Sequence, residues 1–242
     1  MQAIIMAAGK GSRIQELTNG DPKSFLKVGD KKLIEYNIDL LHQYGIWDIT
    51  IVIGYRDDAF RELTKDIPGI RLVYNPFYEM VNVIGSFFMG MGNLHDDFVY
   101  LHADTICEEK LFRRLLTAEG DIILPVDTKP CDEEAMKVKI QGKNVIAITK
   151  QMPVEDAAGE FIGIARLSRK VLPAIRQAAT DLMREKNFKE YFEAAIQKVI
   201  PQKKYDIRML DTEGAFWGEV DFAEDYRKVA GFAEAGVRGV AY

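Results

Sequence analysis

The stretch that decides the fold is AIIMAAGKGSR, residues 3–13, near the start of the chain. Its apolar first residues predict a short buried strand. The strand leads into a loop of small residues. Because Gly9 and Gly11 carry no side chain, the backbone N–H groups of this loop can come close to an anion. Arg13 and Lys23 follow and can hold negatively charged oxygens as a planar fork and a point charge. A Gly-x-Gly sequence alone is also typical of a plain β-turn among surface cations.

Composition narrows the class of protein. The 242 residues fit one large α/β domain or two small ones, and the net charge of −5 argues against nucleic acid or an anionic membrane surface as the main partner. The first apolar run breaks at Gly9, which is too early for a signal peptide or a membrane span, so no membrane insertion is expected. Cys107 and Cys131 match neither a metal-ligand spacing nor a disulfide framework. A reducing, cytoplasmic location is therefore expected.

Hydrophobic periodicity beyond the loop predicts alternating helices and strands. Apolar residues recur at helical spacing over 31–44, and residues 48–54 form a second apolar run. A polar-faced helix over 57–65 and a third strand over 70–74 follow. This alternation predicts a parallel, right-handed, doubly wound sheet. Ligands of such sheets bind at the carboxyl ends of the strands, where the opening loop lies.

The rest of the chain continues the α/β pattern. We expect helices over 83–91, 108–118 and 223–235, a helix capped by Ser168, and further helical pattern over 182–199. Strands are expected over 98–104, 121–127, 136–141, 144–150, 159–167 and 215–220. No repeat, low-complexity stretch or long linker divides the chain. The sequence therefore predicts a single α/β domain.

Two of the predicted strands finish at an aspartate, Asp104 in one case and Asp221 in the other. Both side chains should emerge at the edge of the sheet that carries the glycine loop. Two carboxylates beside an anionic ligand predict a site for a hard divalent cation, most naturally Mg²⁺. Each aspartate alone is also typical of a turn or a helix cap, and Asp221 can cap the helix that follows it.

Two other kinds of phosphate-binding loop are disfavoured. A dinucleotide fingerprint needs a third glycine at position 14, where this chain has Ile14. It also needs an acid at the end of the second strand, where the chain reads Gly54-Tyr55-Arg56. The Gly-x-x-x-x-Gly-Lys-Ser/Thr pattern of a P-loop is absent.

A longer set of motifs resembles a known family. Residues 6–13, Leu17-Thr18, Pro22-Lys23 and Leu33-Ile34-Glu35 are similar to the signature of nucleotidyltransferases that act on sugar phosphates and related molecules. Further motifs resemble the cytidylyltransferase branch, which includes bacterial phosphocholine and 2-aminoethylphosphonate cytidylyltransferases: Asn82 to Ser86 with Phe87-Phe88, the strand end at Asp104, Lys150, Gly159 to Ile164, and Trp217 to Asp221. The chain departs from the branch at Val83, where a second Asn often follows Asn82.

The resemblance implies a fold and a nucleotide site. The fold would be a single Rossmann-like domain of the glycosyltransferase-A type, with a mainly parallel, mixed sheet flanked by helices. Residues 1–105 would form its nucleotide-binding half and residues 106–242 its acceptor-binding half. Lys23, Arg13 and Asp104 would be catalytic, and Asp104 and Asp221 would hold Mg²⁺ as the cofactor. CTP would be bound by Ala8, Gly9, Gly11, Ser12, Arg13, Lys23, Asn82 and Ser86, with base discrimination at Ala8, Gly9 and Ser86.

Three further residues are the candidates for binding the acceptor: Lys150, Glu160 and Trp217. An acid and aromatic rings would suit a cationic amine, and Tyr78 and Phe216 would lie behind them. Trp217 and Phe216 are equally compatible with core positions, and Glu160 with a structural ion pair to Lys150. His102 lies two residues before Asp104, and the sequence predicts no role for it.

The expected activity is transfer of CMP from CTP to a small phosphorylated or phosphonate acceptor, with release of pyrophosphate. Phosphocholine and 2-aminoethylphosphonate are the favoured acceptors. One alternative is a nucleotidyltransferase for a sugar 1-phosphate or an inositol phosphate. Another, of a different class, is a catalytically silent nucleotide-binding regulator. The apolar residues of 182–199 can pack on the same domain or on a second subunit, so a homodimer stays open.

Overall fold

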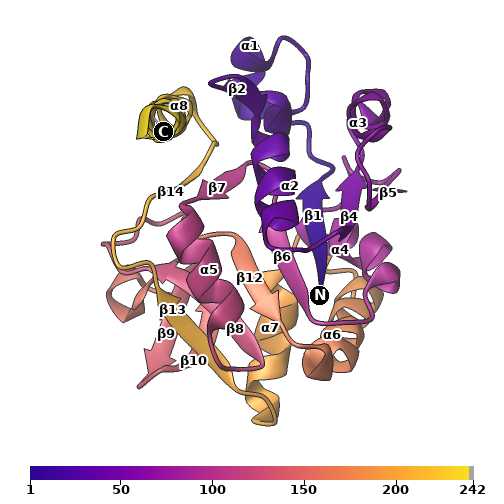
Figure 1. The fold of residues 1–242 in the computed structure, drawn as a ribbon. Helices are drawn as coiled ribbons and strands as arrows, with labels where there is room; N and C mark the ends of the chain where they lie inside the picture. Colours follow the sequence, from indigo (N-terminus) through magenta and orange to yellow (C-terminus); the bar gives the residue numbers. More distant parts are fainter. Residues whose placement is uncertain (240–242) are drawn as a thin grey trace.

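The first strand shows how the sequence builds the layers. All six residues of β1, Gln2–Ala7, are buried. Successive side chains of a strand point to opposite faces. Ile4 and Met6 accordingly belong to one hydrophobic core, and Ile5 belongs to a second core on the other face. In the computed structural model, which describes residues 1–239, helices cover both faces of the sheet that contains β1 (Figure 1).

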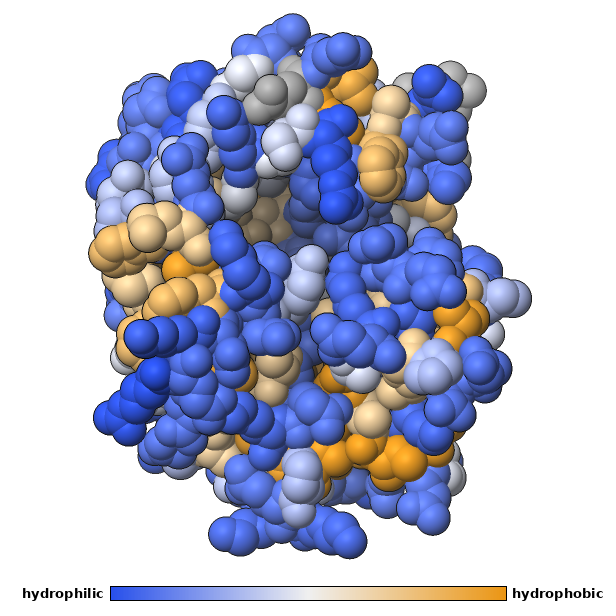
Figure 2. All heavy atoms as spheres, turned by 180° about the vertical axis from the view of Figure 1, so that it is seen from behind, coloured by the Kyte–Doolittle hydropathy of each residue, from blue (hydrophilic) through white to orange (hydrophobic). Residues whose placement is uncertain are grey.

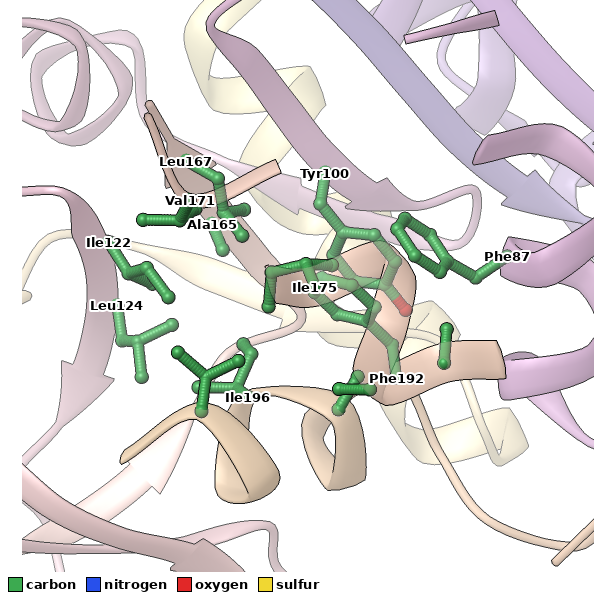
Figure 3. Close-up of a cluster of buried hydrophobic side chains, with 14 of the residues drawn as sticks. Phe87, Tyr100, Ile122, Leu124, Ala165, Leu167, Val171, Ile175, Phe192 and Ile196 are labelled. Carbon is green, nitrogen blue, oxygen red and sulfur yellow. The ribbon is translucent and has the colours of Figure 1, made fainter. Parts of the chain in front are cut away.

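Each layer of helices closes one of the two cores. The core around Ile5 takes side chains from α2 (Leu33–Gln43), α3 (Asp57–Thr64) and α5 (Glu109–Thr117). The core around Ile4 takes them from α4 (Val83–Gly90), α6 (Leu172–Arg184) and α7 (Glu193–Val199). Figure 3 shows this second core, in which Phe87, Tyr100 and Phe192 lie together beside Ile175 and Ile196. Its members are almost entirely aliphatic and aromatic, so burial of apolar surface stabilises the packing of helices on the sheet.

The main sheet has ten strands in the order β11-β9-β10-β13-β8-β12-β6-β1-β4-β5. Their bounds are β1 Gln2–Ala7, β4 Asp48–Ile53, β5 Ile70–Tyr74, β6 Phe98–His102, β8 Ile122–Asp127, β9 Lys137–Gln141, β10 Asn144–Thr149, β11 Gly159–Phe161, β12 Ile164–Leu167 and β13 Ile207–Asp211. Strands β6, β1, β4 and β5 pair in parallel, as do β8 and β13. The remaining pairs are antiparallel.

The fold is therefore α/β with a mixed sheet flanked by helices in a single domain, as predicted. Its parallel pairs lie largely in the N-terminal half, where β6, β1, β4 and β5 are neighbours, whereas the later strands pair mostly antiparallel. The strand predicted over 159–167 is two strands, β11 and β12, separated at Gly163, which has a φ of +77°. The helix predicted over 182–199 is the end of α6 followed by α7, and β13 has no counterpart among the predicted strands.

Two small sheets and two further helices surround the carboxyl ends of the central strands. β2 (Lys27–Val28) pairs with β3 (Lys31–Lys32), and β7 (Thr105–Cys107) pairs with β14 (Trp217–Glu219). The strand predicted over 215–220 is thus shorter and lies outside the main sheet. Helices α1 (Gln15–Thr18) and α8 (Ala223–Gly239) lie at the same end of the molecule (Figure 1). Within residues 1–239, no helix combines the length and the apolar character needed to cross a bilayer.

Candidate active site

Three segments that are far apart in the sequence meet at Lys23. This residue follows Pro22 and opens a short 3₁₀ turn, Asp104 lies two residues beyond the end of β6, and Asp221 lies between β14 and α8. The Lys23 Nζ atom forms ion pairs with Asp104 Oδ2 and with Asp221 Oδ1, the second at 2.6 Å. The expected convergence of the two aspartates beside Lys23 is therefore observed.

The charges at this junction stabilise one another. Burial lowers the pKa of Lys23, but the carboxylates of Asp104, Asp221 and Glu219 outweigh this effect and raise the pKa above its ordinary value. Burial raises the pKa of Asp221, but Lys23, followed by Arg13, lowers it below the ordinary value. Lys23 is thus a cation held between two anions.

The glycine loop lies directly against Lys23. Gly11 has a φ of +65°, and a Cβ atom there would lie 2.7 Å from Lys23 Cβ. Glycine is required at this position both for the backbone conformation and for the close approach. Among the described residues, no intramolecular acceptor is found for the backbone N–H of Gly9 or Gly11, so both are free to bind an anion. Arg13 lies over the ring of Phe222, 5.5 Å from its centroid.

A cleft of about 1210 Å³ joins these groups to the other half of the domain. Seen from behind, the molecule is hollowed in the upper half of its surface, and mostly hydrophilic residues border the hollow (Figure 2). All predicted site residues but one line the cleft: Ala8, Gly9, Gly11, Arg13, Lys23, Asn82, Ser86, Asp104, Lys150, Glu160, Trp217 and Asp221. The exception is Ser12, whose side chain is exposed and which is outside the set of lining residues.

The two residues at α4 that are predicted to bind the nucleotide differ in the hydrogen bonds of their side chains. Asn82 caps the helix, accepting from the N–H of Val83 at 2.8 Å and donating to the carbonyl of Lys189 at 3.1 Å. Its amide is therefore tied to the backbone. Ser86 accepts a hydrogen bond from the buried amide of Asn75 at 3.0 Å. This contact orients the Ser86 hydroxyl and leaves its proton available for a ligand.

The predicted acceptor residues lie on separate segments of the cleft wall: Lys150 directly follows β10, Glu160 lies on β11 and Trp217 on β14. Lys150 places its Nζ atom over the ring of Tyr191, 4.7 Å from the centroid, and forms no ion pair with Glu160. Burial raises the pKa of Glu160 to about 7, helped by the nearby carboxylates of Asp132, Glu219 and Asp127. Trp217 donates from Nε1 to Asp127 Oδ2 at 2.8 Å and also packs against the core around Ile5. Trp217 is thus both a wall of the cleft and a member of the core.

The sequence prediction missed a partly buried polar group beside this junction. His102 contacts Glu219 Oε1 through Nδ1 at 3.3 Å and the hydroxyl of Tyr100 through Nε2 at 2.9 Å. Burial lowers the pKa of His102, but the hydrogen bond to Glu219 and the surrounding carboxylates raise it to about 9. His102 and Glu219 each lie two residues before a predicted aspartate, and alternate residues of a strand share a face. That spacing is the sequence signal that could have identified them.

The acidic groups fit a hard divalent cation. Asp104 and Asp221 already direct one oxygen each at a single positive charge, the Lys23 ammonium, which shows that their carboxylates can share a cation. Ligand atoms of His102, Asp104 and Glu219 also lie within 4.8 Å of one another. Carboxylate oxygens are the ligands that Mg²⁺ prefers.

Comparisons with known proteins agree with this geometry. A family model described as a MobA-like NTP transferase domain matches residues 3–195. Among curated proteins, the chain is 25% identical to a CTP:phosphoglutamine cytidylyltransferase of Campylobacter jejuni, covering 93% of this chain and 97% of that protein. It is 30% identical to a choline-phosphate cytidylyltransferase of Streptococcus pneumoniae, covering 95% and 96%. A solved structure of a CTP:phosphocholine cytidylyltransferase from Streptococcus pneumoniae superimposes with a TM-score of 0.81 at 28% identity, covering 96% of this chain and 98% of that one.

Proposed function

The chain belongs to the family of MobA-like NTP transferase domains, and from this premise we propose that it transfers CMP from CTP to a small phosphorylated or phosphonate acceptor. The observation that carries the proposal is the junction at which Lys23 binds Asp104 and Asp221 beside the glycine loop. Similarity to cytidylyltransferases over nearly the whole chain supports CTP as the donor.

The proposed reaction is a displacement at phosphorus. An oxygen of the acceptor phosphate or phosphonate attacks the α-phosphorus of CTP, the bond to the β-phosphate oxygen breaks, and pyrophosphate leaves. The attacking oxygen is already anionic, so the reaction needs no strong general base. Catalysis consists mainly of aligning two polyanions and neutralising their repulsion.

Each residue of the junction has a role in this proposal. The N–H groups of Gly9 and Gly11, with Arg13, bind the β- and γ-phosphates. The Lys23 ammonium stabilises the charge that develops around the α-phosphate. Mg²⁺, held by Asp104 and Asp221 when bound, supplies positive charge to the phosphate oxygens.

The cleft favours an acceptor with a cationic group over a sugar. Its C-terminal wall presents carboxylates, aromatic rings and lysines, whereas Asn82 is the one amide among the described lining residues and is tied to the backbone. A cationic amine is held by an acid and by aromatic faces, and the lining provides both. The lining thus supports the phosphocholine or 2-aminoethylphosphonate class.

Pyrophosphate release tests the proposal. The protein is incubated with MgCl₂, each of CTP, UTP, ATP and GTP in turn, and a panel of acceptors that includes phosphocholine, 2-aminoethylphosphonate, inositol 1-phosphate and glucose 1-phosphate. We expect acceptor-dependent release with CTP that a chelator abolishes. Release with none of the nucleotides would instead support a silent nucleotide-binding regulator.

A further inference from the structure

One oxygen of a buried carboxylate in the acceptor half of the cleft has no hydrogen-bond partner. Glu193 begins α7, is 2% exposed and lines the cleft, and its Oε2 atom is buried without a donor. Buried polar groups in folded proteins are almost always paired, because leaving one unpaired is costly. An unpaired carboxylate oxygen at a cleft wall therefore points to a donor supplied by a ligand.

The packing around Glu193 prevents its carboxylate from turning out to solvent. The preceding residue, Phe192, stacks on Tyr100 with ring centroids 4.0 Å apart and packs on Phe87 at 4.5 Å (Figure 3). The following residues Ala195 and Ile196 are fully buried in the same core. Glu193 is thus a fixed acceptor rather than a mobile surface acid.

The charges near Glu193 match a dipolar ligand. Burial raises the pKa of Glu193, while nearby His102 and Lys150 lower it and Glu219 raises it. Glu160, also in the cleft, has Lys150 in its surroundings as well. The basic side chains Lys150 and His102 and the acidic side chains Glu193, Glu160 and Glu219 therefore share this end of the cleft. Groups of both signs can complement a zwitterion with an anionic and an ammonium end.

We propose that the acceptor carries an ammonium group with N–H bonds, and that Glu193 is the residue that selects it. This inference rests on the proposed function and decides between two of its acceptors. A primary ammonium can donate to Glu193 Oε2, whereas a trimethylammonium group has no N–H and would leave that oxygen unpaired. A quaternary group is instead best held by open aromatic faces, and the ring of Tyr191 already has Lys150 over it.

Acceptor pairs that differ only in N-methylation test the proposal on the unmodified protein. With CTP and MgCl₂, kcat/KM is measured for phosphoethanolamine against phosphocholine, and for 2-aminoethylphosphonate against 2-(trimethylammonio)ethylphosphonate. We expect the primary ammonium compound to be preferred at least about tenfold in each pair, because a site built around a hydrogen bond rejects a ligand that cannot make it. Equal or better use of phosphocholine would overturn the inference.

A variant then assigns the preference to Glu193. Glu193→Gln should raise KM for the primary ammonium acceptors about tenfold to a hundredfold and leave KM for CTP unchanged. Glu190→Gln, the same change three residues earlier and outside the cleft lining, should have neither effect. If Glu193→Gln still prefers the primary ammonium acceptors, the role given to this residue is wrong. If the variant does not fold, the acceptor pairs measured on the unmodified protein still test whether N–H bonds are required.

The two proposals fail in different ways. If CTP yields no pyrophosphate with any acceptor, the proposed function is wrong. If CTP turns over but acceptors without N–H bonds are used as well as those with them, the proposed function stands and only the inference about Glu193 is wrong.

Discussion

At the scale of single residues, the site depends on the close approach of the glycine loop to a lysine and on the pairing of that lysine with carboxylates. Gly11 lets the loop lie against Lys23, and Lys23 in turn pairs with two carboxylates and reduces the repulsion between them. Because each of these residues acts through its neighbours, single substitutions should change activity more than they change the fold.

Removing either charge at the junction should slow turnover. We expect Lys23→Ala and Asp104→Ala each to lose about 10²–10³ in kcat, which is typical for loss of a group that stabilises charge in the transition state. Pyrophosphate release with CTP measures the loss. Lys27→Ala, an exposed neighbour on β2, is the control and should retain full activity. Near-normal turnover of either site variant would contradict the assignment.

Gly11→Ala tests whether activity depends on the close approach of Gly11 to Lys23. The added Cβ would lie 2.7 Å from Lys23 Cβ, so Lys23 must move, and we expect kcat to fall about tenfold to a hundredfold. Gly142→Ala is a matched control, because Gly142 has a nearly equal φ of +63° but no atom within 4 Å of the position of a Cβ. Backbone strain should be similar in the two variants, as thermal denaturation can show. Equal activity of the two would mean that contact with Lys23 is irrelevant.

Glu160 should make stability depend on pH. Its pKa is about 7 in the folded protein against an ordinary 4.5, so the folded state holds this proton more tightly than the unfolded state does. Stability contributed by the neutral form is present below pH 4.5 and is lost as pH rises to about 7. After allowance for solvent screening the loss should be about 1–2 kcal/mol.

Urea denaturation of the wild type and of Glu160→Gln at several pH values checks this expectation. The difference in unfolding free energy between the two proteins should grow in favour of the variant between pH 4.5 and pH 7. A difference that stays constant across this range would show that Glu160 titrates normally.

At the scale of elements, short strands and their connections position the acceptor side of the cleft. The side chain of Lys137 on β9 is completely buried, and its Nζ atom donates to the carbonyls of Glu133, Ala135 and Lys150, at 2.7, 3.4 and 2.9 Å. A single cation thus ties the loop before β9 to the end of β10. Because Lys150 and Ala135 line the cleft, this tie also shapes the acceptor wall.

Lys137→Met should therefore destabilise the protein by at least about 2 kcal/mol, because it leaves buried carbonyls without a donor. It should also raise KM for the acceptor more than KM for CTP. Urea denaturation and steady-state kinetics measure the two effects. Lys139→Met on the same strand removes only a partly exposed ion pair with Asp156, at 3.1 Å, and should cost less than about 0.5 kcal/mol. Equal stability of the two variants would contradict the role given to Lys137.

At the scale of the whole molecule, one sheet carries both halves of the site. Strand β1 leads into the glycine loop and β6 leads to Asp104, and the same sheet continues through β8 to the acceptor wall. The two cores lie on opposite faces of this sheet and each extends across it. The nucleotide-binding and acceptor-binding halves, 1–105 and 106–242, stay predictions as functional divisions, as do the cytoplasmic location and the homodimer.

The shared sheet predicts a single cooperative unfolding transition. The two tryptophans report on different regions, since Trp47 stacks on His42 in the N-terminal half and Trp217 packs beside the cleft. Thermal melts followed by fluorescence of Trp47→Phe and Trp217→Phe should each coincide with the melt of the same variant followed by circular dichroism. Midpoints that differ within one variant by more than about 3 °C would indicate two separately folding units.

Local sequence patterns predict much of the fold. The apolar run before the glycine loop predicted β1, and helical spacing predicted α2 and α3 to within two residues at each end. Each of these elements is buried on one face or on both, so its apolar residues recur with the period of a helix or a strand. The later strands did not follow as closely. A glycine that divides β11 from β12 and a half-exposed strand such as β13 carry weaker patterns than a fully buried strand does.

The sequence alone was enough to predict the class of fold, the family and a short set of residues with complementary charge. The three-dimensional arrangement was needed to show that Lys23 binds both aspartates, that Ser12 is outside the cleft lining, and that Glu193 Oε2 is buried there without a hydrogen-bond donor. Local patterns record which side of an element is buried, because burial is a property of each residue. Pairings between residues such as Lys23 and Asp221, 198 positions apart, depend on how the strands are ordered in the sheet, and no local pattern records that order.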